Sequence, residues 1–257
     1  MGSVARLAFL AFLISVVVGL AAGLGTRAHL WGYETGFIRI FPFCPYAAAV
    51  GVVLGIVWAL IALFSTAGTG AGYAVLGLAG SLAVVAVPLY DYVMADVVHG
   101  IPPIHDISTD TENAPGFVAL LHERQGAANP AGYDGPKRVR TYGGKFSTTV
   151  ALQKKYYSDI RGVGVLIPPA KLYARALNAV KAMDWRIVAA VPDAQGGRIE
   201  ATSRSFLFGF VDDIVIRVKP AGMGARLDIR SKSREGDNDF GRNAANIRAF
   251  AKKLAGM

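Results

Sequence analysis

Three long apolar runs in the first 95 residues constrain this chain more than any other feature. The runs are Leu7–Leu24, Ala47–Phe64 and Tyr73–Leu89, and each is close to the length of about 20 residues with which a helix crosses a bilayer. The first run also has features of a signal peptide, but the two apolar runs that follow favour an uncleaved first transmembrane helix. The sequence therefore predicts an anchor over residues 1–95, with three transmembrane helices at about 7–24, 47–64 and 73–89.

Small residues recur in these runs at a spacing that favours helix–helix packing. Gly19 and Gly23 are four residues apart, as are Gly51 and Gly55, and Gly77 lies in the third run. Small side chains let two helix backbones approach closely in lipid. Glycine is also simply frequent in membrane helices, but we expect these residues to lie where the helices meet.

Most of the charge lies in the other part of the chain, residues 96–257. The whole chain has a formal net charge of +9 and is 53% hydrophobic, which is more apolar than an average soluble protein. A basic domain beside a bilayer can be held near anionic lipid head groups. Because basic and acidic residues are interspersed, a solvated surface is the simpler interpretation. The one cysteine, Cys44, excludes a disulfide within the chain.

Residues 96–150 lack a regular apolar period and are rich in turn-forming residues. Proline, glycine, asparagine and aspartate gather in 101–117 and again in 129–136. Such clusters mark turns and extended chain. We therefore predict an extended connector over 96–150 and a folded domain over 151–257.

From about residue 157 the apolar residues become periodic. Strand-like alternation occurs in 159–167, 185–191, 198–204, 211–219 and 225–234. Helical spacing occurs in 170–183 and 242–254, and Asp239 is placed to cap the second helix. The order β-α-β-β-β-β-α predicts a membrane-anchored α+β protein. Its C-terminal domain would have two layers, an antiparallel sheet covered on one face by two helices.

The opposite face of this sheet is predicted to be charged. Arginine forks suit carboxylates and phosphates, so the face is a candidate anion-binding site. Acidic residues are interleaved with the arginines, which favours a structural ladder of cross-strand ion pairs instead. We expect such pairs among Glu200, Arg217, Asp228 and Arg230. The full set of candidates is Glu200, Asp213, Arg217, Asp228, Arg230 and Arg234.

The sequence shows no catalytic constellation. Asp212 and Asp213 are adjacent in a strand, so their side chains point to opposite faces and cannot act together on one substrate. His105 and Asp106 are neighbours, but with His99 they lack a further ligand at metal-binding spacing. We therefore expect no catalytic residue, metal or cofactor, and keep His105, Asp106 and Asp212 as weaker candidates.

A family resemblance rests on four segments: HDISTD at 105–110, GRIEAT at 197–202, FGFVDDIVIRV at 208–218 and RSKSREGDNDFGRNAANIRAF at 230–250. They resemble the signatures of an uncharacterised bacterial and plastid family, catalogued as domain of unknown function 1499, over roughly 100–257. Many members have a hydrophobic N-terminal part and an envelope-facing domain. The resemblance thus implies the bacterial inner membrane, with the N-terminus in the cytoplasm and the C-terminal domain in the periplasm. It implies no activity and no ligand.

Together these observations favour a non-enzymatic binding or accessory domain of the cell envelope. Besides the bilayer itself, the expected partner is an anionic lipid, a wall component or another membrane protein. Nucleic acid is not expected, because a periplasmic domain would not meet it and aromatic residues are not interleaved with the basic strands.

Two alternatives remain open at this point. One is an envelope hydrolase or transferase that uses Asp212 or Asp213 together with Arg217 and Arg230. The other is a carrier of a small apolar ligand, held between the sheet and the helices around Trp185, Ile216 and Phe250.

Overall fold

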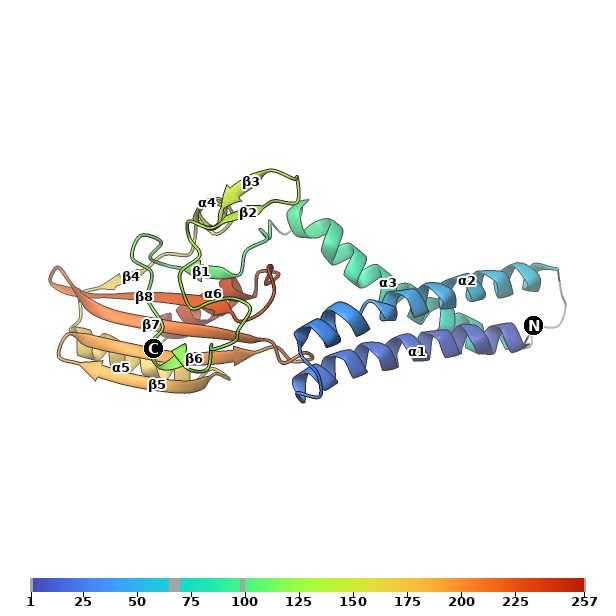
Figure 1. The fold of residues 1–257 in the computed structure, drawn as a ribbon, viewed down its shortest axis with the longest axis horizontal. Coiled ribbons are helices and arrows are strands. Elements are labelled where there is room, and N and C mark those ends of the chain that lie inside the picture. Colours follow the sequence, from blue (N-terminus) through green and yellow to red (C-terminus); the bar gives the residue numbers. More distant parts are fainter. Residues whose placement is uncertain (1, 65–69, 98–99, 257) are drawn as a thin grey trace. The chain divides into compact units, whose positions relative to one another are not determined.

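The computed structural model describes residues 2–64, 70–97 and 100–256, which form two compact units. The first unit comprises Met1–Met94 together with Phe206–Gly209, and the second comprises Ala95–Ser205 together with Phe210–Met257. Figure 1 shows that long helices make up most of the first unit and that a sheet with shorter helices makes up the second.

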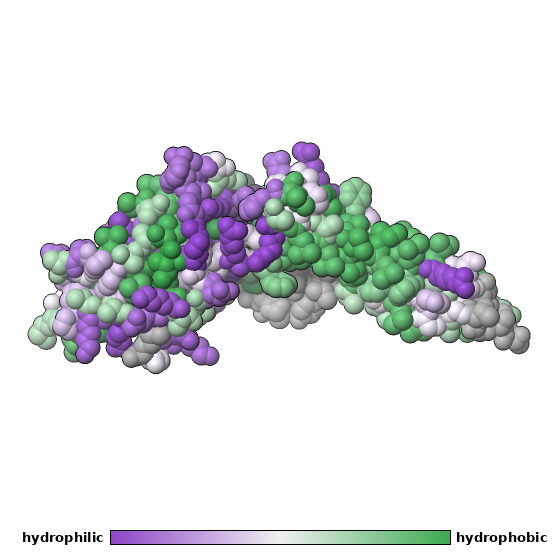
Figure 2. All heavy atoms as spheres, turned by 90° about the horizontal axis from the view of Figure 1, so that it is seen from below, coloured by the Kyte–Doolittle hydropathy of each residue, from purple (hydrophilic) through white to green (hydrophobic). Residues whose placement is uncertain are grey.

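The first unit supports two of the three predicted membrane spans. Its elements are α1 (Gly2–Arg27), the π-helix η1 (Glu34–Ile40), α2 (Phe43–Leu63) and α3 (Ala71–Val97). Among the described residues, two helical stretches are long and apolar enough to cross a membrane, Gly2–Arg27 and Glu34–Leu63. Figure 2 shows hydrophobic residues over most of the visible surface of these helices.

The third predicted span, 73–89, is not confirmed. It lies in α3, which is helical as expected, but the apolar stretch of that helix runs over Ala71–Ala86. The remainder of the predicted span, 87–89, lies outside the residues whose side chains the structure describes. A third crossing therefore stays a prediction.

The small residues of the first unit lie where its helices meet, as predicted. A Cβ atom added to Gly77 would stand 2.9 Å from the backbone oxygen of Ala8, and one added to Gly51 would stand 2.2 Å from the Ser81 hydroxyl. Gly19 faces the Cys44 sulfur in the same way, at 3.3 Å. Larger side chains at these positions would push the helices apart.

The second unit is built on an antiparallel sheet of six strands. Its order is β1-β8-β7-β6-β5, and β4 also pairs with β8. The strands are β1 (Asp106–Ser108), β4 (Val163–Val165), β5 (Arg186–Asp193), β6 (Gly196–Arg204), β7 (Val211–Ala221) and β8 (Gly224–Ser233). A separate hairpin joins β2 (Arg138–Arg140) to β3 (Phe146–Thr148).

The two longer helices of this unit cover one face of the sheet. The short helices η2 (Ala119–Leu121) and α4 (Thr149–Tyr156) are followed by α5 (Pro169–Lys181) and α6 (Arg242–Ala255). From β4 onward the order β4-α5-β5-β6-β7-β8-α6 confirms the predicted β-α-β-β-β-β-α. Alternate strand residues such as Ile214 and Ile216 point toward the helices, where they meet Val180 and Phe250 in one buried cluster.

The opposite face of the sheet is not open to solvent, in contrast to the one-sided sheet that the alternation predicts. The segment 109–136, expected to be part of an extended connector, runs across this face, in front of the sheet in Figure 1. Its Phe117 and Leu120 pack on Val215 of β7. The segment 96–150 also supplies β1, which pairs with β8. The sheet is therefore covered on both faces, by helices on one side and by irregular chain on the other.

Candidate functional site

The charged face of the sheet forms a buried ionic layer beneath the segment 109–136. The side chains of Glu200, Asp213 and Asp228 are fully buried, and Arg230 is 1% exposed. Buried charges are stable only when they are paired and hydrogen-bonded. Each of these groups has such a partner.

Arg217 and Asp228, two of the four residues expected to form cross-strand ion pairs, do pair with each other. The two residues are directly opposite in the register of β7 and β8, and their Nη2 and Oδ2 atoms are 3.3 Å apart. Asp110 of the covering segment adds a second carboxylate, 3.0 Å from the same Arg217 nitrogen. Arg226 completes the group, with its Nη2 2.9 Å from Asp228. This part of the layer is the ladder that the sequence predicts, reinforced from outside the sheet.

Arg230 and Glu200 do not pair with each other. Arg230 donates from Nε and Nη2 to the two carboxylate oxygens of Asp106, both at 2.8 Å. Its guanidinium also lies between the rings of Phe117 and Tyr133, at 4.8 and 5.3 Å from their centroids. Asp106 thus has a structural partner, and Arg230 is enclosed on every side.

Glu200 holds the covering segment by its backbone. Its carboxylate accepts hydrogen bonds from the amides of Val118, Ala119 and Leu120 at 2.9 to 3.2 Å. Arg198, two residues away on the same strand, lies 3.0 Å from the same carboxylate. A carboxylate that meets the free amides at the start of a helical turn is favoured by the local dipole. Glu200 therefore acts as a structural clamp.

The two adjacent aspartates lie on opposite faces, as predicted. On the covered face, Asp213 accepts from Arg124 at 2.5 Å and from Arg234 at 2.8 Å. On the helix face, Asp212 accepts from Ser233 at 2.7 Å and meets Arg242 of α6 at 2.8 Å. Burial raises the pKa of Asp212, and the nearby Arg242 opposes that shift.

A second buried cluster joins the strand β8 to the covering segment. Lys232 is fully buried, and its ammonium lies 2.8 Å from Asp134 and 3.6 Å from Asp106. The His105 ring lies 2.9 Å from the same Asp134 oxygen. Burial lowers the pKa of Lys232. Burial alone would raise the pKa of Asp134, but hydrogen bonds from His105 and Lys232 outweigh it and hold that pKa well below its usual range.

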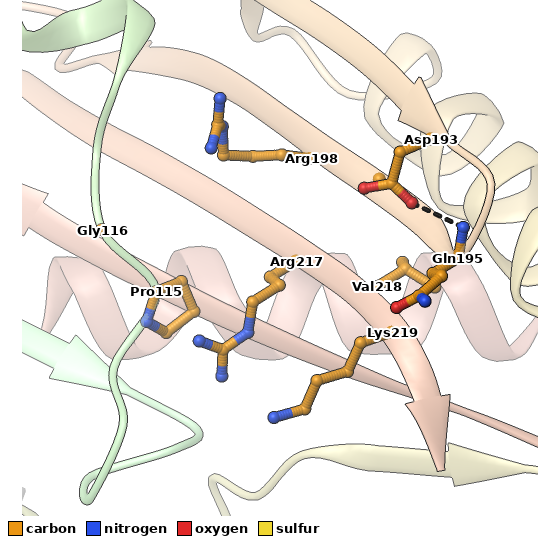
Figure 3. Close-up of a pocket in the computed structure, with 9 residues that line it drawn as sticks. Pro115, Gly116, Asp193, Gln195, Arg198, Arg217, Val218 and Lys219 are labelled. Atoms are coloured by element: carbon orange, nitrogen blue, oxygen red, sulfur yellow. Dashed lines mark hydrogen bonds between the residues drawn. The ribbon is translucent and has the colours of Figure 1, made fainter.

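One edge of the charged face stays open as a pocket of about 270 Å³. Figure 3 shows Arg217 and Lys219 extending from β7 and Arg198 from β6, with Pro115 and Gly116 of the covering segment alongside. Arg198 and Arg217 are directly opposite in the strand register. Like charges placed opposite each other destabilise a sheet unless an anion lies between or beside them.

The cations of this pocket are incompletely neutralised by the protein. Among the described residues, no carboxylate lies within ion-pair distance of Lys219, and the Nε of Arg217 has no hydrogen-bond acceptor. The one acidic residue in the wall, Asp193, instead accepts a hydrogen bond from the amide of Gln195 at 2.7 Å. The pocket therefore offers three cations, one of them without a counter-ion, to an incoming anion.

Comparison with known families gives one match. A family model described as a protein of unknown function (DUF1499) matches residues 106–254, which is more than half of the chain. The chain belongs to the DUF1499 family. No curated protein and no solved structure matches it. The match begins at β1 and ends within α6, so the DUF1499 domain includes both the ionic layer and the pocket.

The described residues of the DUF1499 domain contain no cluster of side chains that could bind a metal ion. No three His, Cys, Asp or Glu side chains converge there on a common point. His105 and Asp106, the weaker metal candidates, are bound to Asp134 and Arg230. His99 lies outside the described residues.

Sequence reasoning missed the covering half of the DUF1499 site. Asp110, Arg124 and Asp134 neutralise charges on strands that lie about a hundred residues further along the chain, and no local pattern marks such contacts. Strand alternation does place Arg198 and Lys219 on the charged face, but it does not distinguish them from their paired neighbours. That distinction requires the position of the covering segment.

Proposed function

We propose that this chain is a membrane-tethered, non-enzymatic binding domain of the bacterial cell envelope, and that it holds an anionic group in the pocket of Arg198, Arg217 and Lys219. The observation that carries the proposal is the ammonium of Lys219, which lies beside two arginines and for which the described residues supply no counter-ion. Such a set suits a phosphate or a carboxylate, since arginine offers a fork of donors and lysine a compact charge. The anion would be a group of a lipid, of a wall component or of a membrane partner.

The tether supports the envelope setting. Two helices that are apolar and long enough to cross a bilayer precede the DUF1499 domain. We propose that α3 makes a third crossing, because an odd number of crossings is needed to separate the two ends, and that the chain lies in the inner membrane with its N-terminus in the cytoplasm and its C-terminal domain in the periplasm. A reporter that is active only in the periplasm, fused after Met257, would be active in this topology and inactive in the opposite one.

The alternative of a hydrolase or transferase loses its geometric support. It requires Asp212 or Asp213 to converge with Arg217 and Arg230 in a cleft. The two aspartates instead lie on opposite faces, and both are buried and paired within the protein. Arg230 is likewise committed to Asp106.

An apolar-ligand carrier would need a cavity between the sheet and the helices, but the core there is filled by side chains. Trp185 stacks on Phe250 with ring centroids 6.2 Å apart, and Ile216 is fully buried beside them. The cavity described near Phe250 and Ile247 has a volume of about 10 Å³. That is the size of one water molecule rather than of a ligand.

Calorimetric titration of the full-length protein in zwitterionic nanodiscs tests the proposal. Glycerol 3-phosphate and acetate serve as the anionic probes and glycerol as the neutral control. We expect saturable binding of at least one anion, with an affinity that falls as salt is raised because the contacts are ionic. An absence of binding for both anions, or equal binding of glycerol, would overturn the proposal.

A further inference from the structure

A second basic region lies outside the ionic layer and outside the pocket. Residues 135–158 contain six basic and no acidic side chains: Lys137, Arg138, Arg140, Lys145, Lys154 and Lys155. All six are exposed. The acid-free stretch 160–183 is equally long but carries four basic side chains, so 135–158 is the more basic of the two.

The hairpin β2–β3 displays these charges on its outer side. Val139 packs against the core, so its neighbours Arg138 and Arg140 point away from it. Arg140 is directly opposite Phe146 in the register, and the Arg138 guanidinium lies 5.3 Å from the centroid of the Phe146 ring. Phe146 itself is 62% exposed. The hairpin therefore presents cations around an uncovered aromatic ring.

The described residues supply no carboxylate as a counter-ion to the cations of the hairpin. In the described parts of the chain, Lys137, Arg138, Arg140 and Lys145 form no ion pair with any carboxylate. The arginines of the ionic layer differ, since Arg230 has a carboxylate at 2.8 Å. We call Lys137, Arg138, Arg140, Lys145 and Phe146 the basic hairpin surface.

We propose that the basic hairpin surface docks onto an anionic lipid bilayer. Clusters of Lys and Arg bind acidic head groups, and aromatic rings settle at the boundary between head groups and hydrocarbon. Here the inference rests on the proposed membrane tether, which keeps a bilayer within reach because helices of membrane-spanning length belong to the same polypeptide. Such tethering raises the effective concentration of the surface at the lipid. The inference goes beyond the proposed function, because none of these residues lines the pocket.

A fluorescent reporter on the hairpin tests the docking. Gly143 in the turn is exposed, and a Cβ atom added there would meet nothing within 4 Å. The full-length Cys44→Ala, Gly143→Cys protein would carry an environment-sensitive dye in nanodiscs of phosphatidylcholine, with or without about one-third phosphatidylglycerol. We expect blue-shifted emission, and quenching by lipids spin-labelled near the head group, only in the anionic nanodiscs.

A charge-matched pair of variants separates docking from a general effect of charge. Arg138→Gln, Arg140→Gln, Lys145→Gln should abolish the shift, because each cation near an anionic surface contributes about fivefold in affinity. The control Lys171→Gln, Lys181→Gln, Lys252→Gln removes three exposed charges elsewhere and should keep it. Circular dichroism confirms that both variants fold. The proposal would be overturned by equal emission in both lipid mixtures, by a shift that survives the hairpin substitutions, or by an equal loss of the shift in the control variant. None of these results depends on the pocket.

Discussion

Arg230 and Asp106 form a two-pronged ion pair, with both hydrogen bonds at 2.8 Å, across 124 residues of sequence. Both side chains are buried. Asp106 lies in the edge strand β1, which leads directly into the covering segment, and Arg230 lies in the neighbouring strand β8. The pair therefore links the folding of residues 106–136 to the formation of the sheet.

Breaking this pair should destabilise the domain strongly. Asp106→Asn leaves the buried Arg230 without a counter-charge, and we expect a loss of about 3–5 kcal/mol in the free energy of unfolding. Asp159→Asn is a matched control, because Asp159 pairs with Arg248 at 2.6 Å but on the exposed surface. The control should lose less than about 1 kcal/mol. Denaturant unfolding of the full-length protein in nanodiscs, followed by circular dichroism, measures both, and similar losses would contradict the assignment.

The clamp at Glu200 should be visible in hydrogen exchange. Glu200→Gln keeps the shape of the side chain but weakens the charge-assisted bonds to the amides of Val118, Ala119 and Leu120. We expect these amides to exchange faster by about tenfold, while the amides of β7 stay protected. Glu112→Gln, which changes an exposed carboxylate, should leave all of them unchanged. Unaltered exchange at 118–120 in the Glu200 variant would refute the clamp.

The helix α6 gives a pH-dependent prediction. Its N-cap position is Gly241 rather than the predicted Asp239, but the Asp239 carboxylate accepts hydrogen bonds from the amides of Gly241 and Asn243 at 2.7 and 2.8 Å. Burial raises the pKa of Asp239 to about 6. Between about pH 4 and 6 the folded protein therefore holds a proton that the unfolded chain releases, so the contribution of Asp239 to stability falls as pH rises.

Asp239→Asn removes this titration. The unfolding free energy of the wild type should therefore fall relative to that of Asp239→Asn between about pH 4 and 6, and the difference should be constant above about pH 7. Thermal unfolding of both proteins across this range measures the difference. A difference that does not vary with pH, or that changes in the opposite direction, would contradict the raised pKa.

Helix packing in the first unit can be tested at two glycines of α3. Gly77→Leu would force a side chain into the backbone of Ala8, whereas a Cβ atom added to Gly72 meets nothing within 4 Å. We expect Gly77→Leu to lower the thermal midpoint in nanodiscs through overpacking, at a cost of about 1–3 kcal/mol. Gly72→Leu should leave the midpoint nearly unchanged. Equal effects of the two substitutions would show that the glycines do not pack.

The sequence predicts those features that local periodicity encodes. Strand alternation correctly separates Asp212 from Asp213 and places Arg217 and Asp228 on one face, because side-chain direction follows from period two. It also gives the element order from β4 to α6. Glycine spacing correctly marks the meeting points of the membrane-like helices, because only small residues fit there.

The covering segment escapes such reasoning because it has no period. Residues 109–136 form turns and one short 3-10 helix. Their conformation is fixed by single contacts such as Arg124 with Asp213 and Glu200 with the amide of Leu120. A contact between residues 80 or more positions apart leaves no local signal. Once the segment is in place, the charged face ceases to be an open surface, and the pocket beside Lys219 remains accessible for a ligand.

The affinity of one variant tests the central claim most directly. Lys219→Met keeps the apolar stem of the side chain and removes the ammonium that has no counter-ion, and Lys171→Met removes an exposed ammonium outside the pocket. In calorimetric titration with whichever of glycerol 3-phosphate and acetate binds the wild type, we predict that Lys219→Met weakens binding by about tenfold or more, the worth of one charge-assisted hydrogen bond. Lys171→Met should bind as the wild type does. Unchanged affinity in Lys219→Met, or an equal loss in both variants, would contradict the assignment of the pocket as the binding site.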